Sequence, residues 1–255
     1  SAVSAAADIV AEQLVYQGDG RALHGYLVYD DATEVKRPGV IVVHEWWGLN
    51  EYAKRRARDL AALGYVALAI DMYGKGKTAT HPSTAQEFSQ EAMSSMDAAQ
   101  KRFMAGVEVL KKFRLTNPEQ IAAIGYCFGG GTVLQMARAG VDLAGVASFH
   151  GMLKPMLTAE PGSIKAKILV FNGESDPFVP AEDVEALKAE MKTAGADFEY
   201  VGYPDAKHSF TNPDADKAGK EFNLPLVYNA AADKDSWEKM QAFFKKVFVE
   251  GAESK

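Results

Sequence analysis

Hydrophobic and polar positions follow two different rhythms along the chain. Near the N-terminus, residues 14–16 and 23–29 have the composition of strands, and the turn sequence GDG lies between them, which predicts a hairpin over residues 11–29. Farther along, short β-branched runs such as residues 40–43 alternate with longer amphipathic segments. A run of this kind is typical of a strand that is buried on both faces. The alternation predicts a mainly parallel sheet with helices on both faces.

The same pattern predicts where the individual elements lie. Strands are expected at residues 40–43, 65–70, 121–124, 143–149, 167–171 and 197–201. Helices are expected at residues 51–63, 83–113, 130–138, 181–193 and 235–249. In a sheet of this kind, functional groups gather in the loops that follow the carboxyl ends of the strands. The strand exits are therefore the places to search for chemistry.

A candidate nucleophile lies at the exit of the strand that ends at residue 124. The sequence there is GYCFGG (residues 125–130), and a helix is expected to begin at once. G-x-C-x-G between a strand and a helix is the nucleophile-elbow pattern, with Cys127 in place of the usual serine. The glycines leave room for a strained turn, and the helix N-terminus favours a thiolate. A dinucleotide loop does not fit, because it needs glycine at position 127. A small buried cysteine that packs beside glycine is the alternative.

An acid and a histidine follow at later strand exits. Asp176 lies in the turn sequence NGESDP, and His208 lies in a loop after the last predicted strand. The order nucleophile, acid, histidine is that of the α/β-hydrolase triad. Glu174 and Asp183 are rivals for the role of the acid. In such a triad the imidazole moves protons, and the carboxylate fixes its tautomer and stabilises its cation.

The loop after residues 40–43 has the sequence HEWWGLN (residues 44–50). In this fold the corresponding loop supplies one N–H group of the oxyanion hole, and the residue after the nucleophile supplies the other. Trp46 and Phe128 are therefore the candidate backbone donors. A zinc motif of the H-E-x-x-H type is excluded, because its fifth position is Gly48 and the segment leaves a strand.

The motifs HEWWGLN, DMYG, GYCFGG, GESDPFVP and AKHSF together resemble those of the dienelactone hydrolase family, over roughly residues 10–250. The resemblance implies an α/β-hydrolase fold with Cys127 as nucleophile, His208 as base and Asp176 as the acid that orients it. Glu45 matches a glutamate of the family that interacts with the resting thiol and helps to trigger thiolate formation. An exposed loop glutamate is the alternative for Glu45.

The chain also departs from the family. The type enzyme holds the carboxylate of its substrate with two arginines, one four residues after the histidine and one on the helix after the DMYG exit. Here the first position is Asn212, and no arginine occurs between Arg58 and Arg102. His81 and Lys75 replace that charge only in part, and each is expected to be a solvated loop residue. We therefore expect neutral esters or lactones as substrates.

Aromatic residues near the strand exits are candidates for an apolar substrate pocket. For any one of them, packing in the core is the alternative. The candidates are Trp46, Trp47, Tyr73, Phe88, Phe149, Phe178 and Phe210.

Composition narrows the classes of function. The 255 residues include 28 Lys and Arg against 34 Asp and Glu, a net charge of −6, so the basic excess of a nucleic-acid binder is missing. No apolar stretch approaches the roughly 18 uncharged residues of a membrane span. The single cysteine excludes an internal disulfide. We expect a small-molecule ester or lactone as partner, no cofactor, no metal, and a monomer or weak homodimer.

The ends of the chain are expected to lie outside the folded part. Residues 1–9 read as a tag remnant or as the end of a processed export signal, residues 10–250 as a single domain, and residues 251–255 as a tail. The protein is expected to be cytoplasmic, or periplasmic if the N-terminus is a processed signal.

Three other functions remain open at this stage. A neutral phosphotriester is a possible side substrate of the same thiol and oxyanion hole. A redox-reactive thiol is a second alternative, although no resolving cysteine is present. A non-catalytic binding module that kept the fold is a third, because fold alone does not decide function.

Overall fold

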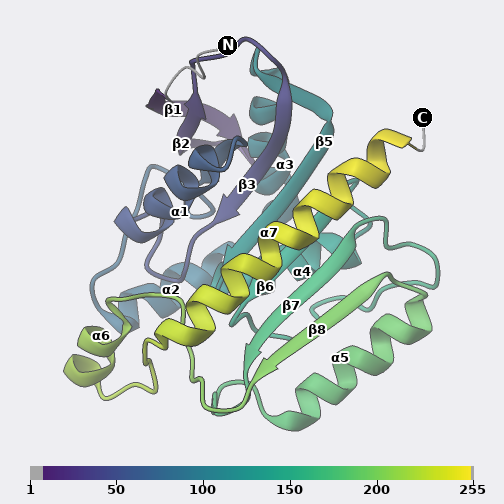
Figure 1. Ribbon diagram of the computed structural model, residues 1–255. Coiled ribbons are helices and arrows are strands. Elements are labelled where there is room, and N and C mark those ends of the chain that lie inside the picture. The colour runs from purple at the N-terminus through teal and green to yellow at the C-terminus, as the bar shows by residue number, and fades with distance from the viewer. Residues whose placement is uncertain (1–7, 254–255) are drawn as a thin grey trace. The chain divides into compact units, whose positions relative to one another are not determined.

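The computed structural model describes residues 8–253, and its elements are labelled in Figure 1. The chain divides into two compact units, of which the first ends at Ala122 and the second begins at Ala123. Strand β5 (Thr116–Tyr126) belongs in part to each. In the described part of the chain, no helix is long and apolar enough to cross a membrane. The single domain over residues 10–250 stays a prediction.

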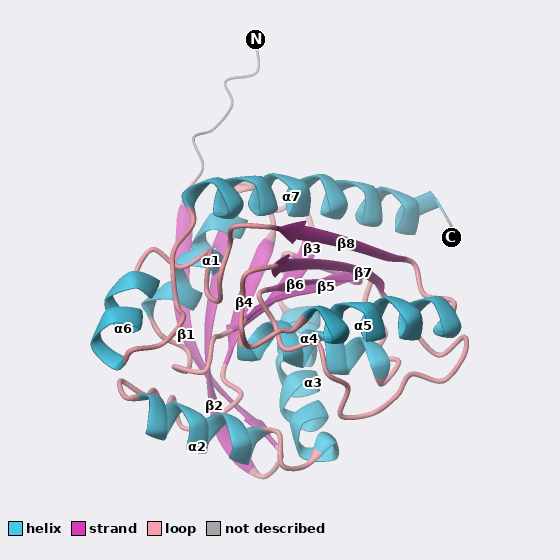
Figure 2. Cartoon of the chain, turned by 90° about the horizontal axis from the view of Figure 1, so that it is seen from below, coloured by secondary structure: helices cyan, strands magenta, loops and turns pink. Residues whose placement is uncertain are grey.

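The first unit is built on an N-terminal hairpin and a parallel strand pair. Before β5, its strands lie in the order β1-β2-β4-β3. β1 and β2 are antiparallel, with Ile9 opposite Asp30, which confirms the predicted hairpin, and β3 and β4 are parallel. Helices α1 and α3 lie on opposite faces of these strands (Figure 1 and Figure 2). The elements are β1 (Ile9–Gly18), β2 (Arg21–Asp30), β3 (Arg37–Val43), α1 (Glu51–Ala62), β4 (Val66–Ile70), α2 (Pro82–Ala92) and α3 (Met96–Lys112).

The second unit is a parallel sheet with helices on two faces. Strands β6, β7 and β8 are neighbours in that order and run parallel. Gly145 of β6 lies against Phe243 of α7, whereas Ser148 lies against Gly130 of α4. Residues three apart on a strand point to opposite faces, so α7 and α4 cover opposite sides of β6. The elements are α4 (Phe128–Arg138), β6 (Gly145–Phe149), β7 (Lys167–Gly173), α5 (Ala181–Ala194), β8 (Phe198–Tyr203), α6 (Ala215–Phe222) and α7 (Ala230–Glu253).

The prediction of one long helix over residues 83–113 is wrong. The chain forms two helices there, α2 and α3, with a break at residues 93–95. The Ser95 side chain accepts a hydrogen bond from the Ala98 N–H at 3.2 Å, the capping interaction that serine makes at a helix N-terminus. The hydrophobic pattern continues across the break, which is why periodicity alone did not reveal it.

Helix α6 was not predicted, and several predicted boundaries moved. α6 has only eight residues, and the two that it buries, Ala215 and Gly219, are small, so its buried face carries little apolar signal. α7 begins five residues earlier than predicted, at Ala230. Residues 1–7, most of the expected N-terminal remnant, lie outside the described residues. Asp8 is part of the hairpin, because its carbonyl accepts a hydrogen bond from the Asp31 N–H at 3.0 Å.

Candidate active site

Cys127 lies at the sharp turn between β5 and α4. Its backbone has a φ of 54° and a ψ of −114°, a conformation that residues with a side chain rarely adopt. The Cys127 N–H donates to the Phe149 carbonyl at 3.0 Å, and the Cys127 carbonyl accepts from the Gly131 N–H at 3.1 Å. A Cβ at Gly125 would overlap the carbonyl oxygen of Gly129. Glycine is therefore required at position 125, as the motif predicts.

The side chains of Cys127, His208 and Asp176 are in contact within the second unit. His208 Nε2 lies 3.0 Å from Cys127 Sγ, and His208 Nδ1 lies 2.7 Å from Asp176 Oδ2. Asp176 Oδ1 accepts a hydrogen bond from the Phe178 N–H at 2.8 Å, which orients the carboxylate. All three residues are buried, with exposed fractions of 9%, 3% and 3% in the order named. We refer to these three residues as the Cys–His–Asp array.

The array changes the proton affinity of its histidine. Burial alone lowers the pKa of His208, but the charge on the Cys127 sulfur and the hydrogen bonds to Asp176 and Cys127 outweigh it and raise the pKa to about 10. His208 therefore favours the imidazolium form at neutral pH while the sulfur beside it is negatively charged. The raised pKa is a property of the Cys127–His208 pair, so it depends on the charge of its partner.

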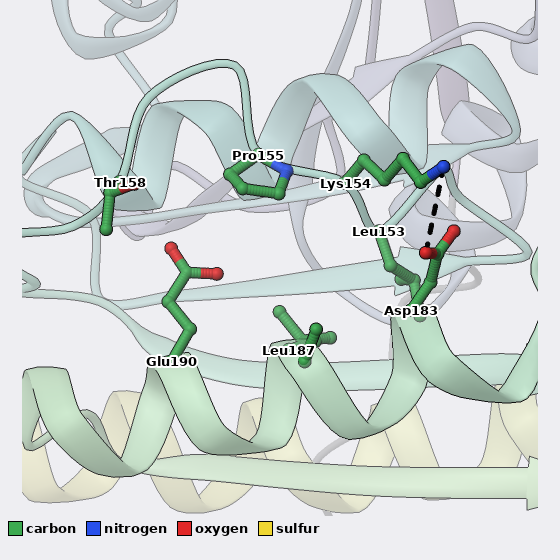
Figure 3. Close-up of a pocket in the computed structure, with 8 residues that line it drawn as sticks. Leu153, Lys154, Pro155, Thr158, Asp183, Leu187 and Glu190 are labelled. Atoms are coloured by element: carbon green, nitrogen blue, oxygen red, sulfur yellow. Dashed lines mark ion pairs between the residues drawn. The ribbon is translucent and has the colours of Figure 1, made fainter.

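The two rival acids have other neighbours. Asp183 on α5 lies 3.8 Å from the Lys154 ammonium group, and both residues line a cavity of about 180 Å³ (Figure 3). Glu174 is exposed, and its side chain lies against Gly202 of β8. Asp176 is the one of the three carboxylates that hydrogen bonds to His208. The structure thus favours Asp176 as the acid of the array.

A second histidine, His150, lies beside the array and was missed by sequence reasoning. It is completely buried, and its ring centroid is 5.6 Å from that of His208 at an angle of 64°. Phe178 contacts His208 from another side, with centroids 5.1 Å apart and rings at 88°. His150 directly follows β6, so its position at a strand exit was a signal available in the sequence.

The loop after β3, in the first unit, is held by buried polar groups. His44 Nδ1 lies 2.6 Å from the Glu45 carbonyl oxygen, and His44 Nε2 accepts from the Met72 N–H at 3.2 Å. Burial lowers the pKa of His44, outweighing the opposite effects of the Glu45 carbonyl and Asp71, which keeps the ring neutral. The Tyr73 hydroxyl donates to the Trp46 carbonyl at 2.8 Å. These contacts fix the backbone of the loop on which Glu45 and Trp46 lie.

Glu45 is not an exposed loop residue, so that alternative is wrong. Only 1% of the residue is exposed. A buried carboxylate loses most of its hydration, which is unfavourable. Proteins contain buried carboxylates where these groups contribute to the structure or to the chemistry. The burial leaves the gating role that the resemblance implies for Glu45 as the interpretation to test.

The candidate pocket residues differ in how much surface they expose. Tyr73, Phe149 and Phe210 are almost completely buried, and Phe149 stacks between Tyr126 and Phe171 with centroids 4.8 Å from each. In the first unit, Trp46, Trp47 and Phe88 are partly exposed; the two tryptophan rings lie 5.1 Å apart, and Phe88 contacts Tyr73 at 5.6 Å. In the second unit, Phe178 is 39% exposed and Phe128, the first residue of α4, is partly exposed.

Comparison with known proteins identifies the family. The chain matches the dienelactone hydrolase family over residues 23–248. It belongs to that family. The protein is therefore an enzyme, a hydrolase that acts on esters or lactones. Protein usf of Aquifex pyrophilus is 29% identical over 242 residues, which cover 92% of this chain and 98% of the relative. A protein of Aquifex aeolicus (strain VF5) that is provisionally named a carboxymethylenebutenolidase is 28% identical, with the same coverage.

Solved structures confirm the predicted α/β-hydrolase fold. The crystal structure of a dienelactone hydrolase-like promiscuous phosphotriesterase from metagenomic libraries has a TM-score of 0.89 and 33% sequence identity, and the match covers 95% of this chain and 100% of the other. An α/β-hydrolase from a Medee basin deep-sea metagenome shares the fold, with a TM-score of 0.69 at 17% identity over 94% and 98% of the two chains.

Asn212, at one of the family's two arginine positions, and Arg102, the next arginine after Arg58, both have local partners. The Asn212 side chain accepts a hydrogen bond from the Asp214 N–H at 2.9 Å. Arg102, the first arginine after Arg58, is 2% exposed, donates to the Met72 carbonyl at 2.9 Å, and pairs with Asp19 at 3.1 Å. A guanidinium that is buried and bound in this way is not available to a substrate carboxylate.

The described residues hold no cluster that suits a metal ion. Across residues 8–253, no group of three or more His, Cys, Asp and Glu side chains is arranged to ligate a metal.

Proposed function

We propose that the protein hydrolyses neutral esters or lactones through a covalent thioester on Cys127. The observation that carries the proposal is the Cys–His–Asp array, in which one imidazole contacts both the sulfur and the carboxylate. This is the geometry that nucleophilic acyl transfer needs: a nucleophile in reach of a base, and a base oriented by a third group.

In the first half-reaction, Cys127 Sγ attacks the carbonyl carbon and a tetrahedral oxyanion forms. The N–H groups of Phe128 and Trp46 are the proposed donors to that oxyanion. Phe128 opens α4, whose N-terminus favours negative charge. The C–O bond to the leaving group then breaks, and the alkoxide takes the proton from His208 Nε2. The products are a free alcohol and a thioester on Cys127.

Acylation itself prepares the second half-reaction. The sulfur of a thioester is neutral, so the largest influence that raises the pKa of His208 disappears once the acyl group is attached. The pKa of His208 then falls, and the neutral imidazole accepts a proton from water. Hydroxide attacks the thioester, the C–S bond breaks, and the carboxylic acid leaves while the sulfur becomes a thiolate beside the imidazolium. Return of the imidazolium proton to the sulfur then regenerates the resting thiol.

The substrate class follows from the charges around the site. Asn212 stands in place of one of the two arginines that hold the substrate carboxylate in the family's type enzyme, and Arg102 is buried in an ion pair. A substrate carboxylate therefore lacks those two cationic partners here. Phe178, which is 39% exposed and touches His208, offers apolar contact instead. A neutral, partly apolar ester or lactone is therefore the favoured substrate.

Glu45 is proposed to regulate the thiol. Glu45 is buried, and hydrogen bonds hold the loop around it. Its carboxylate can therefore adopt few positions. Following the resemblance, the carboxylate interacts with the resting thiol and promotes thiolate formation when substrate enters. Glu45→Gln is expected to slow acylation and leave the fold intact.

The test is hydrolysis of a neutral aryl acetate by matched variants. Cys127→Ala and His208→Ala are expected to abolish turnover, while Asp176→Asn retains residual activity at about 10⁻² to 10⁻⁴ of wild type, because loss of the orienting acid alone is less severe than loss of nucleophile or base. Asp183→Asn is the control, because Asp183 pairs with Lys154, and its activity is expected to equal that of wild type. Equal turnover by wild type and Cys127→Ala would refute the proposal.

A second candidate activity is hydrolysis of neutral phosphotriesters. The structure that shares 33% identity and a TM-score of 0.89 with this chain is described as a promiscuous phosphotriesterase. The same sulfur would attack phosphorus, with the phosphoryl oxygen in the oxyanion hole, while the P–O bond to the aryl oxide breaks and the aryl oxide leaves with the His208 proton. Water that gives its proton to His208 would then break the P–S bond and release the dialkyl phosphate. Release of aryl alcohol from an aryl dialkyl phosphate by wild type, and its loss in Cys127→Ala, is the expected result. Release that persists in Cys127→Ala would contradict this assignment.

A further inference from the structure

His150 is held in a backbone conformation that needs support from its surroundings. It has a φ of 41° and no exposed surface. Its N–H donates to the Phe171 carbonyl at 2.8 Å, which ties it to β7. A positive φ at a residue with a side chain is strained and persists only where neighbouring contacts determine it. The contacts of the ring show what this placement achieves.

The imidazole of His150 packs inside the loop that carries His208. Its Nε2 lies 2.8 Å from Thr211 Oγ1. Its ring lies 5.6 Å from that of His208 and 5.1 Å from that of Phe210, at angles of 64° and 78°. Ser209, between these residues, has a φ of 57°, so the chain turns sharply there. Three of the four residues from 208 to 211 thus place a side chain against His150.

The backbone of the same loop is held by a different segment. The His208 carbonyl accepts from the Val227 N–H at 3.2 Å, and the Phe210 carbonyl accepts from the Asn229 N–H at 3.0 Å. These bonds fix the main chain, but they do not themselves limit the rotation of the His208 ring about its side-chain bonds. That rotation is limited by Asp176 at Nδ1 and by the rings of Phe178 and His150.

We propose that His150 is a positioning residue for the catalytic base. Through Thr211 and through ring contacts with His208 and Phe210, it keeps His208 Nε2 directed at Cys127 Sγ. The inference rests on the proposed function, because it assigns a role toward His208 as the base. His150 moves no proton in this scheme and contacts no substrate. Catalytic groups must be held within about 0.5 Å of the productive geometry, so loss of this support is expected to reduce the rate of acylation.

The hydrogen bond between His150 and Thr211 provides a sharp test. Thr211→Val keeps the shape of this fully buried residue and removes the hydroxyl, whereas Thr211→Ser keeps the hydroxyl. With a neutral aryl acetate, Thr211→Val is expected to lower kcat by about 5- to 20-fold with KM within twofold of wild type, because small misplacements of reacting groups slow the chemical step. Thr211→Ser is expected to retain kcat within about twofold, since the positioning bond remains.

The controls separate positioning from a loss of folding. Ser236→Ala removes another buried hydroxyl of the second unit, one that donates to the Asp233 carbonyl, and is expected to leave kcat unchanged. If Thr211→Val does not fold, His150→Gln and His150→Leu supply the same comparison, because only Gln keeps a polar group near Thr211.

The outcomes distinguish this inference from the proposed function. If wild type depends on Cys127 but Thr211→Val has the kcat of wild type, the positioning role is wrong and the proposed function stands. Equal losses of kcat in Thr211→Val and Thr211→Ser also overturn the role, as does a lower Tm without a lower kcat. If Cys127→Ala is as active as wild type, the proposed function fails and the role of His150 fails with it.

Discussion

At the scale of single residues, the proton on His208 responds to the charge of its neighbours. The pKa of this buried histidine is raised despite its burial, because Cys127 and Asp176 both favour the imidazolium. Cys127 and Gly125 were predictable, because the strand–turn–helix pattern requires a glycine where a side chain would overlap Gly129. His150 was not predicted: its place at a strand exit was visible in the sequence, but that position gains meaning only from Thr211 and His208 around it.

The charge coupling makes a prediction for the titration of His208. In Cys127→Ala the sulfur charge is absent, so burial, which lowers the pKa, acts against Asp176 alone, and the pKa of His208 is expected to fall well below the wild-type value of about 10. Titration of the imidazole nitrogens by NMR, with His208 assigned through a His208→Gln variant, measures the change. The same pKa in wild type and Cys127→Ala would show that the sulfur is not the source of the shift.

At the scale of the elements, strand exits organise the candidate chemistry. The strands were predictable because each is a short apolar run between turn residues, and β6 and β7 are buried along almost their whole length. The break between α2 and α3 was missed, because the Ser95 side chain caps the start of a new helix, α3, while the hydrophobic pattern continues. Helix α6 was missed because it is short and its buried residues, Ala215 and Gly219, are small.

The turn from β5 into α4 makes a prediction at this scale. Gly125→Ala places a Cβ against the backbone of Gly129, which cannot move without shifting the start of α4. The variant is expected to lose at least about 3 kcal/mol of unfolding free energy and nearly all esterase activity, because overpacking against backbone has no cheap relaxation. Urea unfolding and aryl acetate turnover measure the two effects.

Gly131→Ala is the matched control for that experiment. Its Cβ would lie 3.3 Å from the Met152 carbonyl oxygen, a tight contact but not an overlap with the helix backbone. It is expected to cost far less stability than Gly125→Ala. Equal stability losses in the two variants would show that the elbow has no special requirement for glycine at position 125.

At the scale of the whole molecule, the alternation of strands and helices predicted a mainly parallel sheet covered by helices. The motifs at the strand exits and their resemblance to the family implied the α/β-hydrolase fold, and the family match over residues 23–248 agrees with it. The net charge of −6 lacks the basic excess that is typical of a nucleic-acid binder. The preference for a neutral substrate was predicted from the absence of the family's arginine pair. The sequence did not reveal what Arg102 does, because its partners Asp19 and Glu91 are distant in the chain.

The absence of the arginine pair predicts how the charge of the substrate affects the rate. For two aryl esters with the same leaving group, one with a neutral acyl chain and one with a terminal carboxylate, kcat/KM is expected to favour the neutral ester by about 10- to 100-fold, since the carboxylate loses its hydration without gaining charge-assisted hydrogen bonds. Initial rates of both esters at one ionic strength measure the ratio. A preference for the carboxylated ester would mean that another cation of the chain replaces the arginines.

The central claim is that catalysis passes through an acyl group on Cys127. Rapid mixing of the protein with a neutral aryl ester, acid quenching within milliseconds and intact mass spectrometry measure this species directly. We expect a burst of aryl alcohol of about one equivalent per protein, a mass increase equal to the acyl group located on the peptide that contains Cys127, and the loss of both in Cys127→Ala. Turnover of the ester without a burst and without an acylated peptide would contradict the account.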